Sequence, residues 1–251
     1  MTLENGKADQ REQNRFKIDR SIYLEGIVCL SKIIESGMGR GWLLEPEAKE
    51  LCREYGLPVG EWAVVDDPEG AAREAERLGF PLAAKIVSSD VIHKSDVGGV
   101  ALNVDAASVK EVFRRMKGIA EGNGYRFEGV LLERMAPPGV ETIIGAKRDP
   151  QFGPVLMFGL GGIFVEVFKD VAFRVAPIDR ADAEEMISEL KAYPVLRGIR
   201  GRKPSDIEGI IDSLLRVSRM VTDLGEIKEI DLNPVIVYEK GCRIVDARVI
   251  L

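Results

Sequence analysis

The sequence has no excess of positive charge and no long apolar run. Its 251 residues include 35 lysines and arginines against 41 aspartates and glutamates, a formal net charge of -6. A protein that binds nucleic acid through general electrostatics needs a basic face, so the composition argues against that class. The longest uncharged run, from Pro150 to Val165, is too short to span a bilayer and is broken by glycine and proline. We therefore expect no nucleic-acid partner and no membrane segment.

Cysteine and histidine are also scarce. The chain has 3 cysteines, Cys29, Cys52 and Cys242, which form no CxxC motif, and a single histidine, His93. Scattered cysteines in odd number are typical of a protein from a reducing compartment. The first residues, MTLENGKADQ, lack the apolar segment of a secretory signal. A cytoplasmic location is the expectation.

Apolar residues make up 45% of the chain, enough for one large domain or two small ones. The order of periodic segments mixes helices and strands without strict strand–helix–strand alternation, which indicates an α+β fold with two α/β lobes and a cleft between them. The expected helices are 22–36, 46–55, 68–78, 106–120, 180–191 and 205–224. The expected strands are 61–65, 82–87, 99–104, 129–135, 139–147, 154–158, 163–168, 171–176, 227–237 and 242–250.

The chain divides near residue 44. Residues 1 to about 20 are polar and aperiodic and read as a loose arm before the helix at 22–36. Pro46 suits a first helical turn and Gly56 a helix end, so a new unit begins at 44. We expect 1–43 to be an arm with a lead-in helix, and 44–251 to be the main domain with two subdomains.

Lys85 lies inside an apolar strand, in the stretch Phe80-Pro-Leu-Ala-Ala-Lys85-Ile-Val. A buried ammonium group is costly without an anionic partner, so this position predicts one. The alternative is an edge lysine whose ammonium group reaches solvent.

A polar loop follows, Ser88-Ser-Asp-Val-Ile-His93-Lys94-Ser95-Asp96-Val-Gly98-Gly99. Its glycines allow backbone N–H groups to approach phosphate oxygens, and Lys94 adds positive charge. A neutral ring nitrogen of His93 can attack phosphorus while neighbouring lysines stabilise the phosphoryl charge. The alternatives are a plain glycine turn and a solvated imidazole.

The stretch from Glu133 through Met135 and two prolines to Glu141 is a candidate hinge. Backbone groups near Met135 would contact an adenine edge, and a carboxylate would accept hydrogen bonds from ribose hydroxyls. Ordinary linker residues between lobes are the alternative.

The C-terminal segment predicts a hairpin with oxygen ligands on one face. Asp231 and Asn233 are two residues apart on a strand, so they share a face. A two-residue turn at Glu239-Lys240 would place Asn233 opposite Asp246, with Cβ atoms about 4.5–5.5 Å apart. Magnesium prefers such oxygens together with phosphate and water. The alternative is a polar outer face, and a one-residue slip would move Asp246 to the other side.

Four further polar residues interrupt apolar strands and are candidates for the same cleft: Asp149, Glu166, Asp170 and Arg174. The run Gly159-Leu-Gly161-Gly162 lacks the context of a dinucleotide fingerprint and indicates a tight turn beside the cleft.

Taken in order, the GFPxxxK strand, the glycine loop, the ExM hinge with its later glutamate and the DxNP hairpin resemble an ATP-grasp domain over about 44–251. More narrowly, the chain is similar to the beta subunits of ADP-forming (NDP-forming) acetyl-CoA synthetases. The stretches that carry this resemblance are KIVSSDVIHKSDVGGV, GVETIIGAKRDPQFGPVLMFGLGGIFVE and EIDLNPV. Succinyl-CoA synthetase beta subunits are more distant, because His93-Lys94-Ser95-Asp96 replaces their glycine- and arginine-rich phosphate loop.

The resemblance implies a role for each candidate. His93 would take a phosphoryl group from a phosphohistidine on an alpha subunit and pass it to ADP. The other implied roles are phosphate contacts from Lys85, Lys94 and Ser95, base and ribose contacts from Glu133, Met135 and Glu141, and Mg²⁺ ligation by Asn233, Asp246 and Asp231.

The implied overall reaction is acyl-CoA + ADP + phosphate ⇌ carboxylate + CoA + ATP. The sequence shows no separate Rossmann unit for CoA, so an alpha partner is implied, in an α2β2 assembly. Two alternatives remain: an ATP-grasp ligase that makes an acyl phosphate on its own substrate, and a non-catalytic nucleotide-binding regulatory module.

Overall fold

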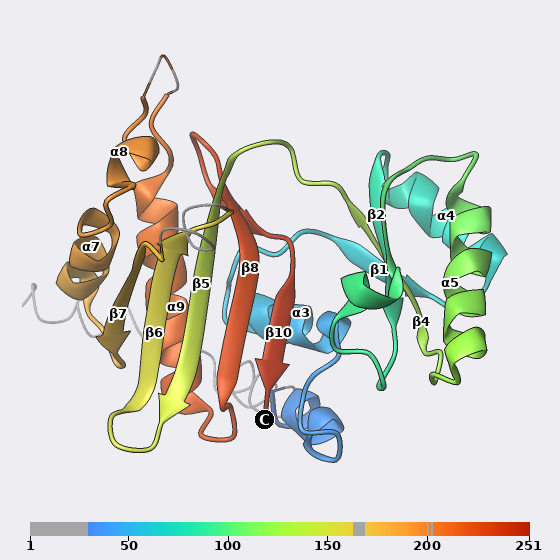
Figure 1. Ribbon diagram of the computed structural model, residues 1–251, viewed down its shortest axis with the longest axis horizontal. Coiled ribbons are helices and arrows are strands. Elements are labelled where there is room, and N and C mark those ends of the chain that lie inside the picture. The colour runs from blue at the N-terminus through green and yellow to red at the C-terminus, as the bar shows by residue number, and fades with distance from the viewer. Residues whose placement is uncertain (1–29, 163–168, 200, 202) are drawn as a thin grey trace, which may run out of the picture.

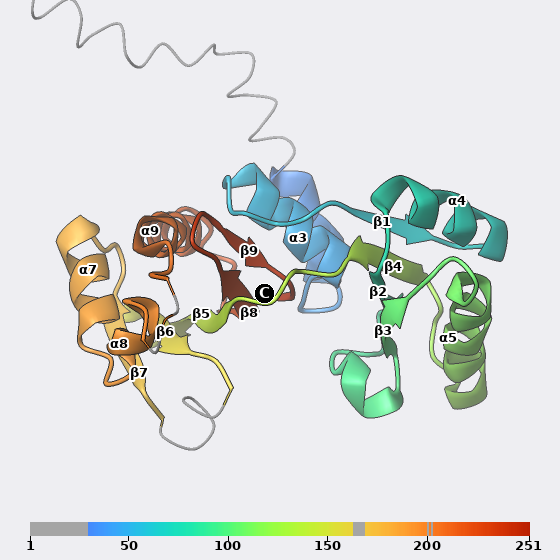
Figure 2. The ribbon, with the colours of Figure 1, turned by 90° about the horizontal axis from the view of Figure 1, so that it is seen from above.

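The computed structural model describes residues 30–162, 169–199, 201 and 203–251. Two antiparallel sheets form two lobes that lie side by side, as Figures 1 and 2 show. The helix α3 (Glu45–Glu54) lies between them, next to β10 (Ala247–Ile250) of the larger sheet. Among the described residues no helix is long and apolar enough to cross a membrane.

The smaller lobe holds a four-stranded sheet in the order β1-β4-β2-β3. Helices α4 (Pro68–Leu78) and α5 (Val109–Asn123) cover one of its faces. The central strand β2 is buried along its whole length, which explains its near-continuous apolar sequence. The strands are β1 (Trp62–Val65), β2 (Leu82–Val87), β3 (Val100–Val104) and β4 (Gly129–Arg134).

The larger lobe holds a six-stranded sheet in the order β10-β8-β5-β6-β7, with β9 paired to β8. Helices α7 (Arg180–Ser188) and α9 (Ile207–Asp223) pack on the face that is turned away from the viewer in Figure 1. The remaining elements are β5 (Val140–Asp149), β6 (Gly153–Leu160), β7 (Val171–Val175), α8 (Tyr193–Leu196), β8 (Glu229–Val237) and β9 (Cys242–Ile244).

Apolar burial holds each lobe together separately. Alternate residues of the larger sheet, such as Ile144 on β5 and Leu232 on β8, meet the apolar face of α9 at Leu214 and Val217. In the smaller lobe, Leu82 of β2 and Phe113 of α5 belong to a second buried cluster. Between the lobes, ion pairs gather around α3, and Leu44, just before that helix, packs against Val87 and Leu131 of the smaller sheet.

The start of α3 is fixed by local chemistry. Pro46 occupies the first turn, and the carboxylate of Glu47 accepts a hydrogen bond from the N–H of Leu44 at 2.7 Å. Glu47 also pairs with Arg40. Carboxylates in a first turn are stabilised by the helix dipole, which adds to the cap. These contacts set the position of Glu45, the first residue of the helix.

Most of the elements expected from the sequence are present, including 68–78 and 82–87 at their expected bounds. The helix expected at 106–120 begins later, at Val109, because Asp105 and Ser108 form a hydrogen-bonded turn in front of it. The strand expected at 242–250 is split into β9 and β10 opposite Pro234, which has no N–H to donate to the ladder. The short helix α8 was not expected. Residues 30–38 are helical, whereas the rest of the expected 22–36 helix and the expected strand 163–168 lie outside the described residues.

We expect Glu47→Ala to lower the free energy of unfolding by about 1–2 kcal/mol, because it removes the α3 cap and the Arg40 pair. Urea unfolding would measure the loss. Glu50→Ala is the matched control, since Glu50 is a partly exposed carboxylate on the same helix, paired with Arg53 on the following turn. Equal losses in the two variants would contradict the assigned cap.

Candidate functional site

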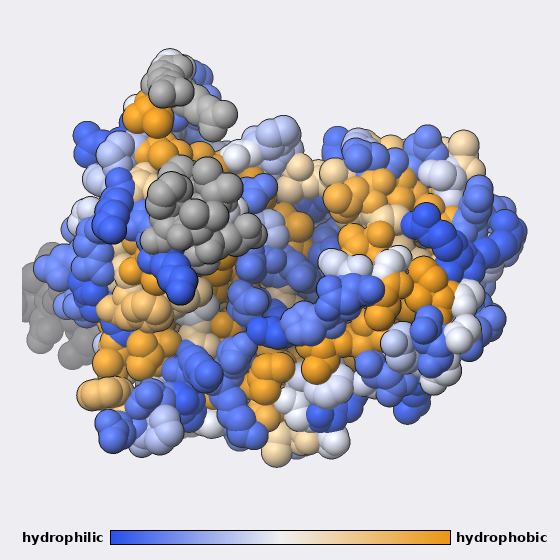
Figure 3. All heavy atoms as spheres, viewed as in Figure 1, coloured by the Kyte–Doolittle hydropathy of each residue, from blue (hydrophilic) through white to orange (hydrophobic). Residues whose placement is uncertain are grey.

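A cleft of about 490 Å³ lies where the lobes meet. Hydrophilic residues gather along this junction in Figure 3. Seven of the predicted site residues line the cleft: Lys85, His93, Lys94, Ser95, Asp231, Asn233 and Asp246. A second groove of about 910 Å³ lies between the end of α3 and α9 and contains none of the predicted residues.

Lys85 does have the anionic partners that its burial predicts. Its ammonium nitrogen lies 2.6 Å from Oε1 of Glu45 and 2.8 Å from Oε1 of Glu133, and it donates to the carbonyl of Val245 at 2.9 Å. Glu133 is a diagonal neighbour on the adjacent strand, because β2 and β4 pair Ala83 with Glu133. Only 7% of the Lys85 side chain is exposed, so the alternative of a solvated edge lysine is wrong.

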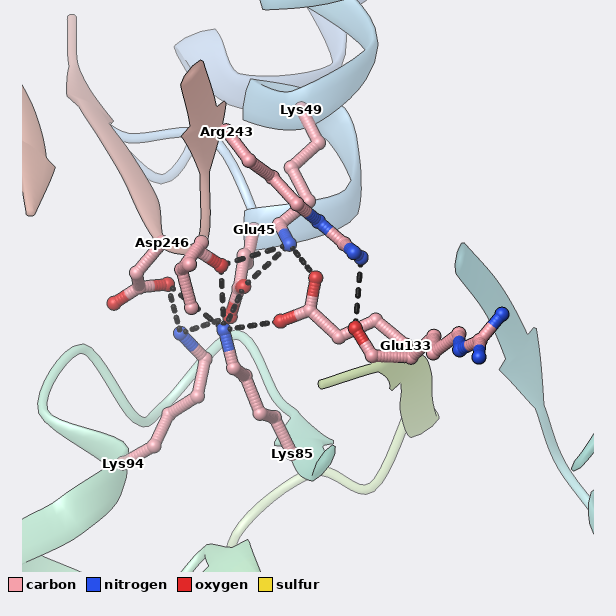
Figure 4. A network of polar contacts seen from close by, with 9 residues as sticks. Glu45, Lys49, Lys85, Lys94, Glu133, Arg243 and Asp246 are labelled. Atoms are coloured by element: carbon pink, nitrogen blue, oxygen red, sulfur yellow. Dashed lines mark hydrogen bonds and ion pairs between the residues drawn. The ribbon is translucent and has the colours of Figure 1, made fainter. Parts of the chain in front are cut away.

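The helix α3 supplies two further members of this cluster. Glu45 and Lys49 are four residues apart and therefore share a helix face, with 3.4 Å between their charged atoms. Lys49 is completely buried, pairs with Glu133 and donates to the carbonyl of Val245 at 2.9 Å. Figure 4 shows how these side chains converge from α3, β2, β4 and the C-terminal hairpin.

The cluster lowers the pKa of Glu45 and raises that of Lys85, and both shifts favour the charged form. Burial raises the pKa of Glu45, but the ammonium groups of Lys85, Lys94 and Lys49 outweigh burial and hold that pKa well below its usual range. Burial lowers the pKa of Lys85, but Glu45, Asp246 and Glu133 together raise it above its ordinary value. Both groups are therefore charged at neutral pH, and the interior of the junction is ionic.

His93 lies at the wall of the cleft. It precedes the short 3-10 helix η2 (Lys94–Val97), and its side chain is exposed. Lys94 reaches inward from the same helix, with its ammonium nitrogen 2.8 Å from Oε2 of Glu45 and 4.0 Å from Asp246. Gly98 adopts a left-handed conformation with φ of 70°, so the chain can turn back into β3 immediately after the loop. The imidazole and two lysines thus line one cleft.

The C-terminal hairpin has the register that the sequence predicts. Val237 pairs with Cys242 and Leu232 with Ala247, so Asn233 lies opposite Asp246, and the N–H of Asn233 donates to the carbonyl of Asp246 at 3.3 Å. Asp231 lies on the same face, opposite Arg248. The carboxylate of Asp231 is 3.8 Å from the Arg248 guanidinium.

The carboxylate of Asp246 suits a cation. Its buried Oδ1 atom has no hydrogen bond from the described residues, although Lys85 and Lys94 lie 3.5 and 4.0 Å from it, and 44% of the whole side chain is exposed. Burial and the carboxylate of Glu45 raise the pKa of Asp246 above its usual value, and Lys85 and Lys94 only partly offset this. Among the described residues no group of three His, Cys, Asp or Glu has the geometry of a metal site, so the amide oxygen of Asn233 would have to be a ligand.

The hinge residues are placed differently from the other candidates. Glu133, Met135 and Glu141 do not line the cleft, and Glu133 is committed to Lys49 and Lys85. The N–H of Met135 donates to the carbonyl of Pro81 at 3.0 Å. Glu141 is exposed at the start of β5. Their nucleotide contacts remain predictions.

Two of the weaker cleft candidates are wrong, because they have structural partners elsewhere. Asp170 accepts hydrogen bonds from the N–H groups of Lys191 and Ala192, and Arg174 pairs with Glu189 at 2.9 Å. Asp149 closes the β5–β6 turn and lines an open groove on the sheet face instead of the cleft. Glu166 lies outside the described residues.

Sequence reasoning missed Glu45, Lys49 and Arg248. Lys49 falls inside the helix expected at 46–55 and Glu45 immediately precedes it, and no chemical role was predicted for either. The one signal in the sequence is that Glu45 and Lys49 carry opposite charges four residues apart at the start of a helix. Many solvent-exposed ion pairs on helices have the same spacing, so this pattern does not identify a buried pair. Arg248 follows Asp246 by two residues on the hairpin and therefore faces the same cleft, which its lining confirms.

Comparisons with known proteins agree with this geometry. The family model described as "ATP-grasp domain" matches residues 35–251. The beta subunit of acetate–CoA ligase [ADP-forming] I from Pyrococcus furiosus is 50% identical over 83% of this chain and 91% of that subunit. Acetate–CoA ligase [ADP-forming] I from Archaeoglobus fulgidus is 45% identical over 98% of this chain, which spans only 36% of that longer protein.

A solved structure of dinucleotide-forming acetyl-coenzyme A synthetase 1 from Ca. Korarchaeum cryptofilum is 48% identical, with a TM-score of 0.78, over 88% of this chain and 99% of that one. That protein was solved with coenzyme A and Mg-AMPPCP, with its phosphohistidine segment pointing towards the nucleotide-binding site. By family model, identity and coverage, this chain belongs to the ATP-grasp proteins that serve as beta subunits of ADP-forming acetyl-CoA synthetases.

Proposed function

We propose that this chain carries a phosphoryl group on His93 between a phosphohistidine of an alpha subunit and ADP. The observation that carries the proposal is the position of the only histidine in the chain. It is exposed at the wall of a cleft that also contains Lys85, Lys94 and the Asn233–Asp246 pair. A nucleophile needs access to phosphorus and positive charge near the transferring oxygens, and this cleft offers both.

A carrier residue is chemically useful because acyl transfer and nucleotide binding occur on different subunits. Phosphohistidine retains a high transfer potential, so little free energy is lost in the relay. The transfer breaks one N–P bond on the alpha subunit and forms another on His93. The His93 N–P bond then breaks as a terminal oxygen of ADP takes the phosphoryl group. The overall reaction would be acyl-CoA + ADP + phosphate ⇌ carboxylate + CoA + ATP.

The hairpin fits a magnesium ion that accompanies the nucleotide. Asn233 and Asp246 lie opposite each other in the hairpin and both line the cleft, and the Oδ1 atom of Asp246 accepts no hydrogen bond from the described residues. Asp231 is the further ligand candidate, with Arg248 opposite it. Magnesium would neutralise charge on the phosphate oxygens, while this chain's own lysines orient them. The Korarchaeum relative with Mg-AMPPCP supports this assignment.

The partner would be an alpha subunit that binds CoA and carries the first phosphohistidine. The Pyrococcus relative is itself named a beta subunit, whereas the Archaeoglobus relative is a single longer chain. Both facts support a partner that supplies CoA binding and the first phosphohistidine. An α2β2 assembly and a cytoplasmic location are further parts of the proposal.

We expect His93→Ala to lower acetyl-CoA-dependent ATP synthesis by the reconstituted complex at least about 1,000-fold, because this chain has no second imidazole to carry the phosphoryl group. ADP affinity should remain within about threefold of wild type, because the other cleft residues are unchanged. A coupled ATP assay and calorimetric titration with ADP would measure the two quantities. Undiminished turnover would reject the relay.

With the alpha subunit, acetyl-CoA and ³²P-phosphate present, wild-type chain should acquire label that is labile to acid and stable to base. The label should be absent from His93→Ala. Label that persists in this variant would show that another residue carries the phosphoryl group.

We expect Asn233→Ala and Asp246→Ala each to weaken Mg²⁺-dependent ADP binding by about tenfold or more, because each removes an oxygen ligand. Magnesium titration at fixed ADP would measure the effect. Glu239→Ala is the matched control, since it removes a carboxylate from the exposed turn of the same hairpin. An unchanged magnesium response in both cleft variants would contradict the assigned site.

A further inference from the structure

Glu45 has no role in the function proposed above, yet it lies between the two cleft lysines. Its Oε1 atom is 2.6 Å from the ammonium nitrogen of Lys85, and its Oε2 atom is 2.8 Å from that of Lys94. Only 1% of its side chain is exposed. A single carboxylate of α3 therefore binds both ammonium groups that would face the phosphates.

The two lysines are held to different degrees. Lys85 has three other contacts, with Glu133, Asp246 and the carbonyl of Val245. Lys94 belongs to the exposed loop that follows His93, and its only other contact in the cluster is Asp246 at 4.0 Å. The exposed fraction of its side chain is 16%, against 7% for Lys85. Lys94 is therefore the lysine that can change partner.

The charges of the described cluster cancel. Three ammonium groups, on Lys49, Lys85 and Lys94, are matched by three carboxylates, on Glu45, Glu133 and Asp246. A phosphate that enters this neutral cluster must bring a cation or displace a carboxylate from a lysine. Displacement from Lys94 is the least costly exchange, because Glu45 keeps Lys85 and Lys49 as partners.

We propose that Glu45 is a positioning residue that occupies Lys94 as an internal anion until a phosphate group of the incoming nucleoside diphosphate replaces it. This inference rests on the proposed nucleotide site. The carboxylate keeps both ammonium groups inside the cleft before binding, and it competes with the phosphate for Lys94. Removal of the Glu45 charge should therefore strengthen nucleotide binding. It should also slow phosphoryl transfer, because the two ammonium groups are no longer held in position.

The first test is Glu45→Gln in the full chain, with ADP affinity measured by calorimetry with and without Mg²⁺. We expect ADP without magnesium to bind at least about tenfold more tightly than to wild type, because a charge-assisted contact no longer competes. The rate of His93 phosphorylation in the complex should fall. Glu50→Gln, on the exposed side of the same helix, should change neither quantity.

Lys94→Gln, alone and in the Glu45→Gln background, completes a double-mutant cycle. The gain in affinity should disappear, because the freed ammonium group is absent. A merely structural Glu45 would give weaker binding and slower transfer together, and that result, or an affinity equal to wild type in a folded variant, would overturn the inference. Wild-type chain that fails to bind ADP at all would instead reject the proposed function.

A second measurement uses the wild-type chain and needs no variant. In a crystal structure of wild-type chain with ADP, the ammonium nitrogen of Lys94 should lie against a phosphate oxygen and beyond 4 Å from Glu45, while Glu45 stays with Lys85. Lys94 still paired with Glu45 beside a bound nucleotide would refute the exchange.

Discussion

The lobes of this protein are joined by a buried set of ion pairs, and the candidate site depends on it. Glu45 and Lys49 come from α3, Lys85 and Glu133 from the smaller sheet, and the Val245 carbonyl from the C-terminal hairpin. Buried charges are tolerated only when they are paired and hydrogen-bonded, so these segments must arrive together. Loss of one member would leave another charge buried without a partner. The network therefore fixes where the smaller sheet stands relative to the hairpin.

This constraint also explains the arrangement of the cleft. At the back of the cleft, the buried ammonium and carboxylate groups balance one another in charge. The groups at its wall are exposed or have fewer contacts: His93 on the loop, Lys94 beside it, and Asp246 with an oxygen that accepts no hydrogen bond from the described residues. Buried ion pairs at the back of the cleft, with more exposed side chains at its wall, suit a reaction in which the protein mainly positions phosphates and stabilises their charge. The helix α3 supplies Glu45 and Lys49 to these buried ion pairs even though it lies outside both sheets.

Much of this could be predicted from the sequence, for identifiable reasons. The hairpin register followed from the turn at Glu239-Lys240 and the two-residue period of strands, which placed Asn233 opposite Asp246. Lys85 predicted an anionic partner because its neighbours are apolar. The identity of that partner could not be predicted, because Glu45 is 40 residues away and only the packing of α3 brings it near. The contact between Glu133 and Lys49 could not be predicted either, because the two residues are 84 positions apart and no local pattern links them.

The most direct test of the proposed relay is whether His93 exchanges a phosphoryl group with a nucleotide bound in this cleft. The half-reaction on this chain can be followed without a partner, as magnesium-dependent exchange of label between ADP and ATP by the isolated chain. We expect exchange through a phosphohistidine intermediate, visible as a phosphoramidate resonance in ³¹P NMR, and its loss in His93→Ala. Exchange that continues at the wild-type rate in this variant would contradict the claim.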